Sequence, residues 1–315
     1  MNTVWSLISQ TFNEWSEDKA QRLGAALAYY AAFSIAPLLI IVVSIINFIY
    51  RADTLPQIQH QIAMVAGNNA ANALVATIRG IHAHGGSTMA TVISIVTLLI
   101  GATGVFTALQ DSLNTIWEVT PKPRRVWTDV LRTRFLSFAL VIAMCFLLLV
   151  SLLVSAALAA ISAYFQMLLP ITDPFWPLVD FAVSFGVTTV LFAMIFKILP
   201  DVDIAWSDVW IGAAATAVLF AIGKIAIGLY LGRSAFASAY GAAGSLLVLL
   251  AWVYYSSQIL FLGAEFTQVY ANHYGSRLRP SRGAMFLTEE ARIRMGIPHT
   301  KTIEEAASKQ RPPAA

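Results

Sequence analysis

Six long apolar runs constrain the fold of this chain more than any other feature. Charged residues are almost absent within them, and they lie near residues 27–50, 89–109, 136–165, 177–199, 209–231 and 243–270. A bilayer core about 30 Å thick is crossed by roughly 20 residues of α-helix, and each run reaches that length. Backbone N–H and C=O groups must be paired internally in hydrocarbon, so such runs should be helices. We therefore expect an all-α, polytopic membrane protein with six transmembrane helices.

The composition agrees with a membrane protein. Of the 315 residues, 58% are hydrophobic and 12% are charged, a profile typical of the membrane class. The single cysteine, Cys145, falls inside the third run and cannot form an internal disulfide. The first run is long enough to span, and acidic residues precede it, so we interpret it as a retained helix and not as a cleaved signal peptide.

The distribution of basic residues predicts the orientation. With six spans and a cytoplasmic N-terminus, fifteen of the 20 lysines and arginines lie on the cytoplasmic side. Only Arg51, Arg79 and Arg233 lie on the extracytoplasmic side, and Lys197 and Lys224 lie within spans. This bias follows the positive-inside rule and places both termini in the cytoplasm. Basic residues therefore set the orientation, and we expect no nucleic-acid partner.

The chain divides into three parts by composition. Residues 1–24 form a cytoplasmic interfacial helix, residues 25–271 the transmembrane domain, and residues 272–315 a basic cytoplasmic tail. The tail is polar and ends rich in proline, so we expect it to be largely disordered, with a short helix near 288–295.

The first part carries one apolar stripe. Trp5, Ile8, Phe12 and Trp15 recur at spacings of three and four residues. Such a helix is expected either to lie flat in the inner headgroup region or to dock on the underside of the helix bundle.

The loop over residues 51–88 is the only long one between spans. It holds two amphipathic stripes separated by Gly67, Asn68 and Asn69. The pattern predicts a helical hairpin on the extracytoplasmic side, between transmembrane helices 1 and 2.

Lys224 is the most informative polar residue inside a predicted span. At 100° per residue it shares an arc of the fifth span with Ala213, Ala217 and Ala221, so the close-packing face of that helix carries a cation. A lysine at this depth costs about 2.5–3.5 kcal/mol on insertion scales and marks a functional site by default. The depth of Lys224 in the membrane suggests Asp180 as its partner. A Lys224–Asp180 pair that only fixes the two helices is an equal alternative to a functional site.

Other polar residues lie at several depths in the spans. Glu265 and Lys197 match in depth, which suggests an ion pair or a shared polar vestibule; alternatively, Lys197 reaches the lipid headgroups. Asn47 and Gln258 add further polar groups to a candidate substrate or ion pathway.

Pro37 lies in the middle of the first span and is expected to kink it. Tyr29, Tyr30 and Ser34 lie on the cytoplasmic side of that position. Interrupted helices with adjacent polar groups often line sites in transporters, although kinked helices without such a role are common.

Motifs for catalysis are absent. The Gly223-Lys224 pair is not a phosphate-binding loop, because the motif requires glycine at Val218 and Ser or Thr at Ile225. No Gly-x-Ser-x-Gly or His-Glu-x-x-His sequence is present. We therefore expect no enzyme activity, no intrinsic ATPase, no cofactor and no metal site.

Several ordered blocks of the sequence resemble one family. They comprise Ala28-Tyr29-Tyr30, Phe33-Ser34, Pro37, Gly104-Val105-Phe106, Leu109-Gln110-Asp111, Asn114, Trp117, Leu199-Pro200-Asp201, Gly212-Ala213, Tyr230, Tyr240-Gly241, Trp252, Tyr254 and Gly263-Ala264-Glu265. Over about residues 20–272 the chain resembles the YihY/virulence factor BrkB family of bacterial inner-membrane proteins. The resemblance implies a six-helix, multi-pass protein of the bacterial inner membrane, and a role in envelope lipid movement has been suggested for relatives. Some members carry a ribonuclease label, but this sequence does not support that activity, because it lacks the cluster of acidic residues that a nuclease uses.

Two functions remain open. The first is a transporter that moves a lipid or another anionic amphiphile, because a buried cation suits an anionic headgroup. The second is a non-transporting scaffold or envelope assembly factor, with the outer hairpin, the N-terminal helix and the tail as docking surfaces for envelope protein partners. Membrane lipids are the partners expected in the first case.

Overall fold

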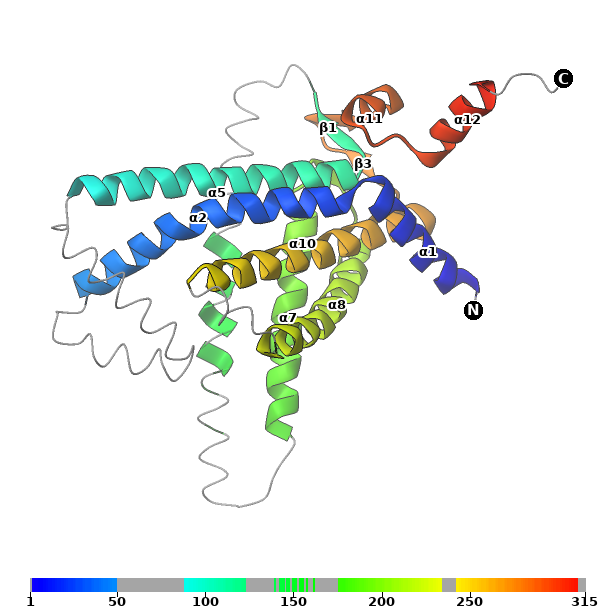
Figure 1. Cartoon of the computed structure of the whole chain (residues 1–315). Helices are drawn as coiled ribbons and strands as arrows, with labels where there is room; N and C mark the ends of the chain where they lie inside the picture. Colours follow the sequence, from blue (N-terminus) through cyan, green and yellow to red (C-terminus); the bar gives the residue numbers. More distant parts are fainter. Residues whose placement is uncertain are drawn as a thin grey trace. The chain divides into compact units, whose positions relative to one another are not determined.

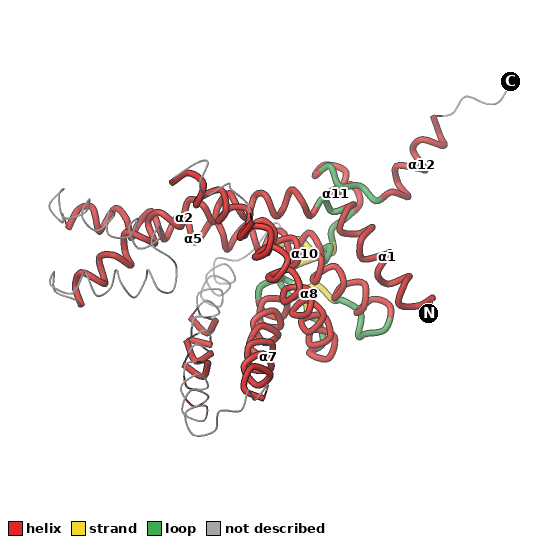
Figure 2. The backbone as a smooth tube through the Cα atoms, turned by 60° about the horizontal axis from the view of Figure 1, so that its bottom comes forward, coloured by secondary structure: helices red, strands yellow, loops and turns green. Residues whose placement is uncertain are grey.

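The computed structural model is mainly helical and describes residues 2–49, 88–122, 175–233 and 242–310, with scattered residues between 139 and 161 (Figure 1). The helices are α1 (Asn2–Glu17), α2 (Ala20–Ile49), α5 (Thr88–Ile116), α7 (Phe175–Ile198), α8 (Trp206–Arg233), α10 (Ala242–His273), α11 (Glu289–Met295) and α12 (Thr300–Gln310). In the described part of the chain the strands form two short antiparallel pairs (Figure 2), β1 (Val119–Pro121) with β4 (Ala284–Phe286) and β2 (Val202–Asp203) with β3 (Arg279–Pro280).

Several of the predicted apolar runs are helices in the structure. Among the described residues, three segments are long and apolar enough to cross a membrane: Leu178–Ile198, Trp206–Ile227 and Leu247–His273. α2 and α5 cover the first two runs and have 30 and 29 residues. Most of the run near 136–165 lies outside the described residues. The predicted outer hairpin also lies outside them, except for Thr88, which is the first residue of α5.

Residues 26–108 form one compact unit, made of most of α2 and α5 in the described part. Two glycines of α5 allow a close approach to α2. A Cβ at Gly101 would lie 3.2 Å from the Cα of Ser34, and a Cβ at Gly104 would lie 2.9 Å from Cδ1 of Tyr30. Small residues at such crossings let two membrane helices pack backbone to side chain.

Residues 1–25 and 109–315 form the second unit, in which α8 packs against both α7 and α10. The α8–α10 contact depends on two reciprocal glycine–threonine pairs. A Cβ at Gly212 would overlap Thr267, and a Cβ at Gly263 would overlap Thr216. Each threonine hydroxyl donates a 2.7 Å hydrogen bond to the helix carbonyl four residues earlier, so neither is left unpaired at the tight crossing.

Polar contacts join the helix ends at one side of this second unit. Asn114, in the last turn of α5, exchanges two hydrogen bonds with Asp201 after α7, one to the carboxylate (3.2 Å) and one from the backbone N–H (2.8 Å). Asp208, in the first turn of α8, accepts from the backbone N–H (2.9 Å) and the hydroxyl (3.0 Å) of Ser276, which follows α10. The ends of α5, α7 and α10 and the start of α8 therefore meet.

The chain after α10 differs from the largely disordered tail that composition predicted. Residues 276–310 contain β3, β4, α11 and α12, and the predicted short helix lies at Glu289–Met295. Thr288 caps the N-terminus of α11, and Gly296 ends it with a left-handed backbone (φ 73°), a conformation that glycine adopts without strain. Strand pairing and burial of Leu278, Ile297 and Arg292 order the segment.

α1 packs against α10, and three of the four residues of its apolar stripe are exposed. Thr11 is buried and Gln10 contacts His273 of α10 at 2.8 Å, whereas Trp5, Ile8 and Phe12 are 73%, 41% and 52% exposed. Trp15, the last member of the stripe, is half-buried and its indole nitrogen is buried, so this end of the stripe packs on the protein, and the predicted place of the stripe in the headgroup region stays a prediction.

Candidate functional site

A cleft between α7 and α8 holds the predicted cation Lys224. It encloses about 50 Å³ and is lined by Phe181, Ser184, Phe185, Thr188, Ala217, Phe220, Ala221 and Lys224. The α7 residues follow a helical spacing, and the two alanines of α8 leave room between the helices. Three phenylalanine rings make the walls apolar, while Ser184, Thr188 and Lys224 provide the polar groups. The small-residue arc predicted for α8 thus faces this cleft.

Lys224 is exposed in the cleft and has no hydrogen bond or ion pair with any described residue. Its predicted partner, Asp180, instead accepts a 2.8 Å hydrogen bond from the hydroxyl of Ser155. The Lys224–Asp180 pair is therefore not formed in this structure. Among the residues that the structure describes, no carboxylate occupies the ammonium group of Lys224.

Lys197 is held at the end of α7 and does not pair with Glu265. Its ammonium donates to the backbone carbonyl of Ile204 at 2.5 Å and lies 5.8 Å from the ring centroid of Trp206. Contact of a cation with an aromatic face is favourable by about 0.5–1 kcal/mol at exposed sites. The structure thus favours the interpretation of Lys197 as a residue of the helix end.

Glu265 of α10 is fully buried, at 0% exposure. Neither of its carboxyl oxygens has a hydrogen-bond partner in the described part of the chain. The charged groups that act on it most strongly are Asp18, Glu14, Arg292 and Glu118. Glu265 therefore belongs with a polar cluster near the start of α2, and Lys197 is not among the charged groups that act most strongly on it.

Gln258 reaches the start of α2 from α10. Its side-chain amide donates to the carbonyl of Ala20 at 3.4 Å, and a Cβ at Gly24 would overlap that amide. Gly24 and Gln258 thus make a close helix contact, and the amide of Gln258 is used for packing.

The five remaining candidates lie on α2, in the other unit. The hydroxyl of Ser34 donates to the carbonyl of Ala31 at 2.8 Å, and the ring of Tyr30 lies against Gly104. The ring of Tyr29 is tilted by 58° against that of Phe33, with centroids 4.7 Å apart. α2 continues through Pro37, but the side chains of Pro37 and Asn47 lie outside the described residues. Helix packing accounts for Tyr30 and Ser34.

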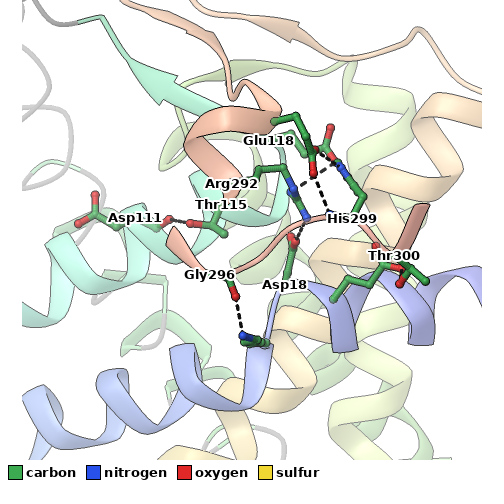
Figure 3. Close-up of polar contacts among 11 residues, drawn as sticks. Asp18, Asp111, Thr115, Glu118, Arg292, Gly296, His299 and Thr300 are labelled. Atoms are coloured by element: carbon green, nitrogen blue, oxygen red, sulfur yellow. Dashed lines mark hydrogen bonds and ion pairs between the residues drawn. The ribbon is translucent and has the colours of Figure 1, made fainter. Parts of the chain in front are cut away.

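A buried ion pair joins the α1–α2 elbow, residues 17–20, to α11 (Figure 3). Nη2 of Arg292 donates to Oδ1 of Asp18 at 2.7 Å, and the two side chains are only 1% and 4% exposed. Nη1 of Arg292 lies 3.6 Å from Oε1 of Glu118, directly before β1. Lys19, which has a left-handed backbone (φ 51°), donates from its ammonium to the carbonyl of Gly296.

His299 extends this network between two carboxylates (Figure 3). Its Nδ1 lies 2.6 Å from Oε2 of Glu289, and its Nε2 lies 3.0 Å from Oε1 of Glu118. Both ring nitrogens can donate at once only when the imidazole is protonated. The geometry therefore favours an imidazolium, which adds a second positive charge beside Arg292.

The network shifts several ionisation equilibria. Burial raises the pKa of Asp18 from 3.8 to about 7, against the opposing effect of Arg292. Burial and the nearby Glu17 carboxylate raise the pKa of Glu14. The pKa of His299 is raised above 6.5: burial opposes the shift, but hydrogen bonds to Glu289 and Glu118 outweigh it. The pKa of Glu289 is lowered, since its bonds to His299 and Thr302 outweigh its slight desolvation.

The ligand atoms of Glu14, Glu17 and His299 lie within 4.8 Å of one another. Both ring nitrogens of His299 already face carboxylates, and Glu17 accepts a hydrogen bond from Thr300 at 2.5 Å. We therefore describe this group as part of the ion-pair network.

Sequence reasoning missed the roles of Arg292 and His299, because it counted the tail only as orienting charge. A local pattern was available: Thr288 with Glu289 and Glu290 is a helix start, and Gly296 is a helix stop. That pattern predicts an ordered helix. The contact of Arg292 with Asp18, 274 residues away, has no local pattern.

The long apolar helices define the class: this is a mostly helical membrane protein. The chain belongs to the family described as Virulence factor BrkB, whose pattern it matches over residues 11–286. The resemblance noted from the sequence is thereby confirmed.

Relatives called UPF0761 membrane protein occur in several bacteria. The protein of Tolumonas auensis is 25% identical over 258 residues, which cover 79% of this chain and 80% of the relative. That of Aeromonas salmonicida is 25% identical over 265 residues, with 80% and 86% coverage. A protein of Stenotrophomonas maltophilia is 26% identical over 260 residues and 81% of this chain, but the match spans only 58% of that longer relative. No solved structure matches the chain.

Proposed function

We propose that this protein is a multi-pass transporter of the bacterial inner membrane that translocates a lipid or another anionic amphiphile. In the proposed topology six helices span the membrane, both termini are cytoplasmic, and a helical hairpin lies outside between the first two spans. The bias of basic residues supports this orientation, and so does the meeting of the ends of α5, α7 and α10 with the start of α8 at one side. The protein acts without ATPase or other enzyme activity of its own.

The observation that carries this proposal is the cleft between α7 and α8. It combines one cation, Lys224, with hydroxyl groups of α7 and three aromatic side chains. An anionic headgroup would pair with the ammonium, while the apolar part of the molecule would contact the rings of Phe181, Phe185 and Phe220. Free phosphate offers the same charge but nothing for the aromatic walls to bind.

The ammonium of Lys224, unpaired among the described residues, suits a ligand that enters and leaves. A lysine inside a span costs about 2.5–3.5 kcal/mol on insertion scales, and no described side chain offsets that cost by pairing with it. An anion that reaches Lys224 offsets part of the cost only while it is bound. Conduction needs binding that is favourable enough to enter and weak enough to release.

Translocation is tested in proteoliposomes that contain a fluorescent anionic phospholipid and a membrane-impermeant quencher. Wild-type protein should allow quenching beyond the outer-leaflet half, and Lys224→Met should abolish the excess. Lys224→Arg keeps the charge and should keep activity. Lys197→Met is the matched control, because it removes a span-end lysine whose ammonium already contacts the Ile204 carbonyl.

Each outcome bears on the assignment. Equal activity of Lys224→Met and wild type overturns the role of Lys224. Equal loss in Lys197→Met would show that any lysine of these helices matters, so the cleft would not be the site. Quenching limited to one leaflet in wild-type vesicles overturns unaided translocation of that lipid. A zwitterionic probe that moves as fast as the anionic one overturns the preference for anions.

A scaffold or envelope assembly factor is the alternative, favoured by the exposed stripe of α1. Trp5, Ile8 and Phe12 face away from α10, as expected of a docking surface for a partner protein. This alternative predicts co-purifying partners that are lost when the stripe is made polar, and full function in Lys224→Met.

A further inference from the structure

Residues 275–287, called here the basic loop, follow α10 and are held against the first turn of α8. The backbone N–H and the hydroxyl of Ser276 both donate to the carboxylate of Asp208, at 2.9 and 3.0 Å. A Cβ at Gly275 would lie 2.3 Å from Oδ2 of the same aspartate, so a larger residue there would displace the carboxylate. The start of the basic loop is therefore fixed to the end of a candidate membrane span.

Strand pairing fixes the rest of the basic loop. β3 pairs with β2, which follows α7, and β4 pairs with β1, which follows α5. In the turn between β3 and β4, the backbone N–H of Ala284 donates to the carbonyl of Ser281 at 2.9 Å. Lys122 joins this turn twice, from its backbone N–H to the Gly283 carbonyl and from its ammonium to the Arg282 carbonyl, both at 3.0 Å. The loop backbone is therefore ordered beside the ends of α5, α7, α8 and α10.

Exposed aromatic side chains indicate the depth of this part of the molecule. The apolar segment of α10 ends at His273 and that of α8 begins at Trp206, so the basic loop begins where two candidate spans end. Trp206, Trp210 and Tyr274 are exposed there. Tryptophan and tyrosine are enriched at the headgroup level of membrane proteins. Since the basic loop is joined to the turn of α8 that carries both tryptophans, it lies at headgroup depth.

Exposed cations are concentrated in the basic loop. The side chains of Arg277, Arg279 and Arg282 are exposed, and so is that of the adjacent Lys122. None of the three guanidinium groups has an ion pair with a described residue. The loop contains no acidic residue, although Asp203 lies opposite Arg279 in the β2–β3 pair. This surface therefore keeps a net positive charge.

Apolar side chains accompany these cations. Met285 and Phe286 of β4, which directly follow the turn that carries Arg282, are 39% and 54% exposed. Guanidinium groups bind phosphate oxygens through two parallel N–H donors, and exposed apolar side chains at headgroup depth reach the boundary of the acyl chains. A phospholipid offers both kinds of contact, whereas free phosphate or a nucleic acid offers no acyl chain. The combination favours a lipid.

We propose that the basic loop, together with Lys122, binds the phosphate headgroup of an anionic phospholipid in the leaflet at which α10 ends. Arg279 and Arg282 are the central phosphate ligands. In the topology proposed above this is the cytoplasmic leaflet. A lipid bound there lies beside four helix ends that the loop already joins. Binding at this surface requires no translocation through the α7–α8 cleft and no contribution from Lys224.

Native mass spectrometry of the full-length protein in detergent tests this assignment. Titration with phosphatidylglycerol, and with phosphatidylethanolamine as the zwitterionic comparison, gives a dissociation constant for each lipid. The wild type should bind the anionic lipid more tightly. Arg279→Gln combined with Arg282→Gln should weaken phosphatidylglycerol binding about 25-fold, because each basic residue near an anionic lipid surface contributes about fivefold.

Three further variants serve as controls. Arg294→Gln with Lys301→Gln removes the same charge from two exposed positions outside the basic loop and should leave binding nearly unchanged. Arg279→Lys with Arg282→Lys keeps the charge and should keep most of the binding. Lys224→Met should bind as the wild type does, so a failure of the cleft as a transport site leaves this result intact. Unfolding midpoints in detergent show which variants keep the fold.

A second measurement leaves every arginine in place. Ser281→Cys, made in a Cys145→Ala background, carries a fluorophore between Arg279 and Arg282 in the full-length protein in vesicles. Phosphatidylglycerol with a spin label on its headgroup should quench this fluorophore more strongly than phosphatidylcholine with the same label. This result would place the anionic lipid at the basic loop, even if the variant with two glutamines did not fold.

Three results overturn the proposal. Equal affinity for the anionic and the zwitterionic lipid, with equal quenching by the two labelled lipids, shows that the loop does not select anions. Equal loss of binding in the loop variant and in Arg294→Gln with Lys301→Gln means that net charge alone attracts the lipid. Inorganic phosphate that displaces phosphatidylglycerol more than chloride does at the same ionic strength shows that the loop binds the free anion.

Discussion

Two cations of this molecule, Lys224 in the α7–α8 cleft and Arg292 on α11, lie in opposite surroundings. Lys224 is exposed in a cleft that aromatic rings line, and it has no charged partner among the described residues. Arg292 is 1% exposed and lies within reach of the carboxylates of Asp18 and Glu118. A cation with its carboxylates in place is a structural element, whereas one without them is available for a ligand. The comparison separates a part of the protein that holds its fold from a part that can bind.

The most direct way to break this comparison is to remove each charge in turn. Arg292→Met leaves Asp18 buried without its partner and should lower the free energy of unfolding by about 3–5 kcal/mol. Lys224→Met should change it by less than about 1 kcal/mol, since it breaks no pair with a described residue. Thermal unfolding in detergent measures both. Similar losses would mean that Lys224 is structural too, and Asp18→Asn combined with Arg292→Met should recover part of the larger loss.

Glycine substitutions sharpen the comparison within the helix bundle itself. Gly212→Ala places a Cβ onto Thr267 and should destabilise the α8–α10 contact by about 1–3 kcal/mol. Gly186→Ala in α7 is the matched control, because a Cβ there meets nothing within 4 Å. It should be neutral or stabilising by up to about 1 kcal/mol, the difference in helix propensity. Unfolding midpoints that fall equally in both variants would contradict the close crossing.

Changing the pH should affect the Arg292 region and not the cleft. Because the pKa of Asp18 and that of His299 are raised in the folded protein, stability should fall as pH rises from 6 to 8 by about 1 kcal/mol, with the contribution of the 33% exposed His299 reduced by solvent screening. The unfolding midpoint against pH measures this. The double variant Asp18→Asn with His299→Gln should flatten the curve, and Lys224→Met should leave its slope unchanged.

The smallest effect on stability is expected at the exposed stripe of α1. Changing Trp5, Ile8 and Phe12 together to serine should alter the free energy of unfolding in detergent by less than about 0.5 kcal/mol, because these side chains bury little area in the fold. The same change should lower insertion of α1 into lipid. An environment-sensitive dye on a cysteine at position 9, an exposed polar site, would then shift to the red in vesicles. A large loss of stability in detergent would show that the stripe packs against protein.

The helices could be predicted from local composition, because the thickness of the hydrocarbon core of a bilayer sets the length of each apolar run. The runs near 177–199, 209–231 and 243–270 correspond to α7, α8 and α10 within a few residues. Lys224 was also found from its helical arc with Ala217 and Ala221, and these three residues line one cleft. Periodicity along one helix is a local property, so a sequence can show it.

Pairing between distant charges was not predictable in the same way. Depth alone suggested Lys224 with Asp180 and Lys197 with Glu265, yet Asp180 bonds Ser155 and Lys197 bonds the Ile204 carbonyl. Depth fixes only the position along the membrane normal, and several helices share each depth. The choice among them depends on rotation and lateral order of helices, which the packing of Gly212 on Thr267 and Gly263 on Thr216 sets.

The sequence by itself determined the class of protein, the positions of the apolar helices, the family and the face of α8 that carries Lys224. These follow from hydrophobic length and helical period, which act over a few turns of chain. Only the tertiary structure decided that residues 276–310 are ordered, that Arg292 pairs with Asp18, and that Lys224 pairs with none of the residues that the structure describes. A buried ion pair forms only where two distant segments are held within about 3–4 Å. That condition belongs to the packed molecule, because no short stretch of residues contains both partners.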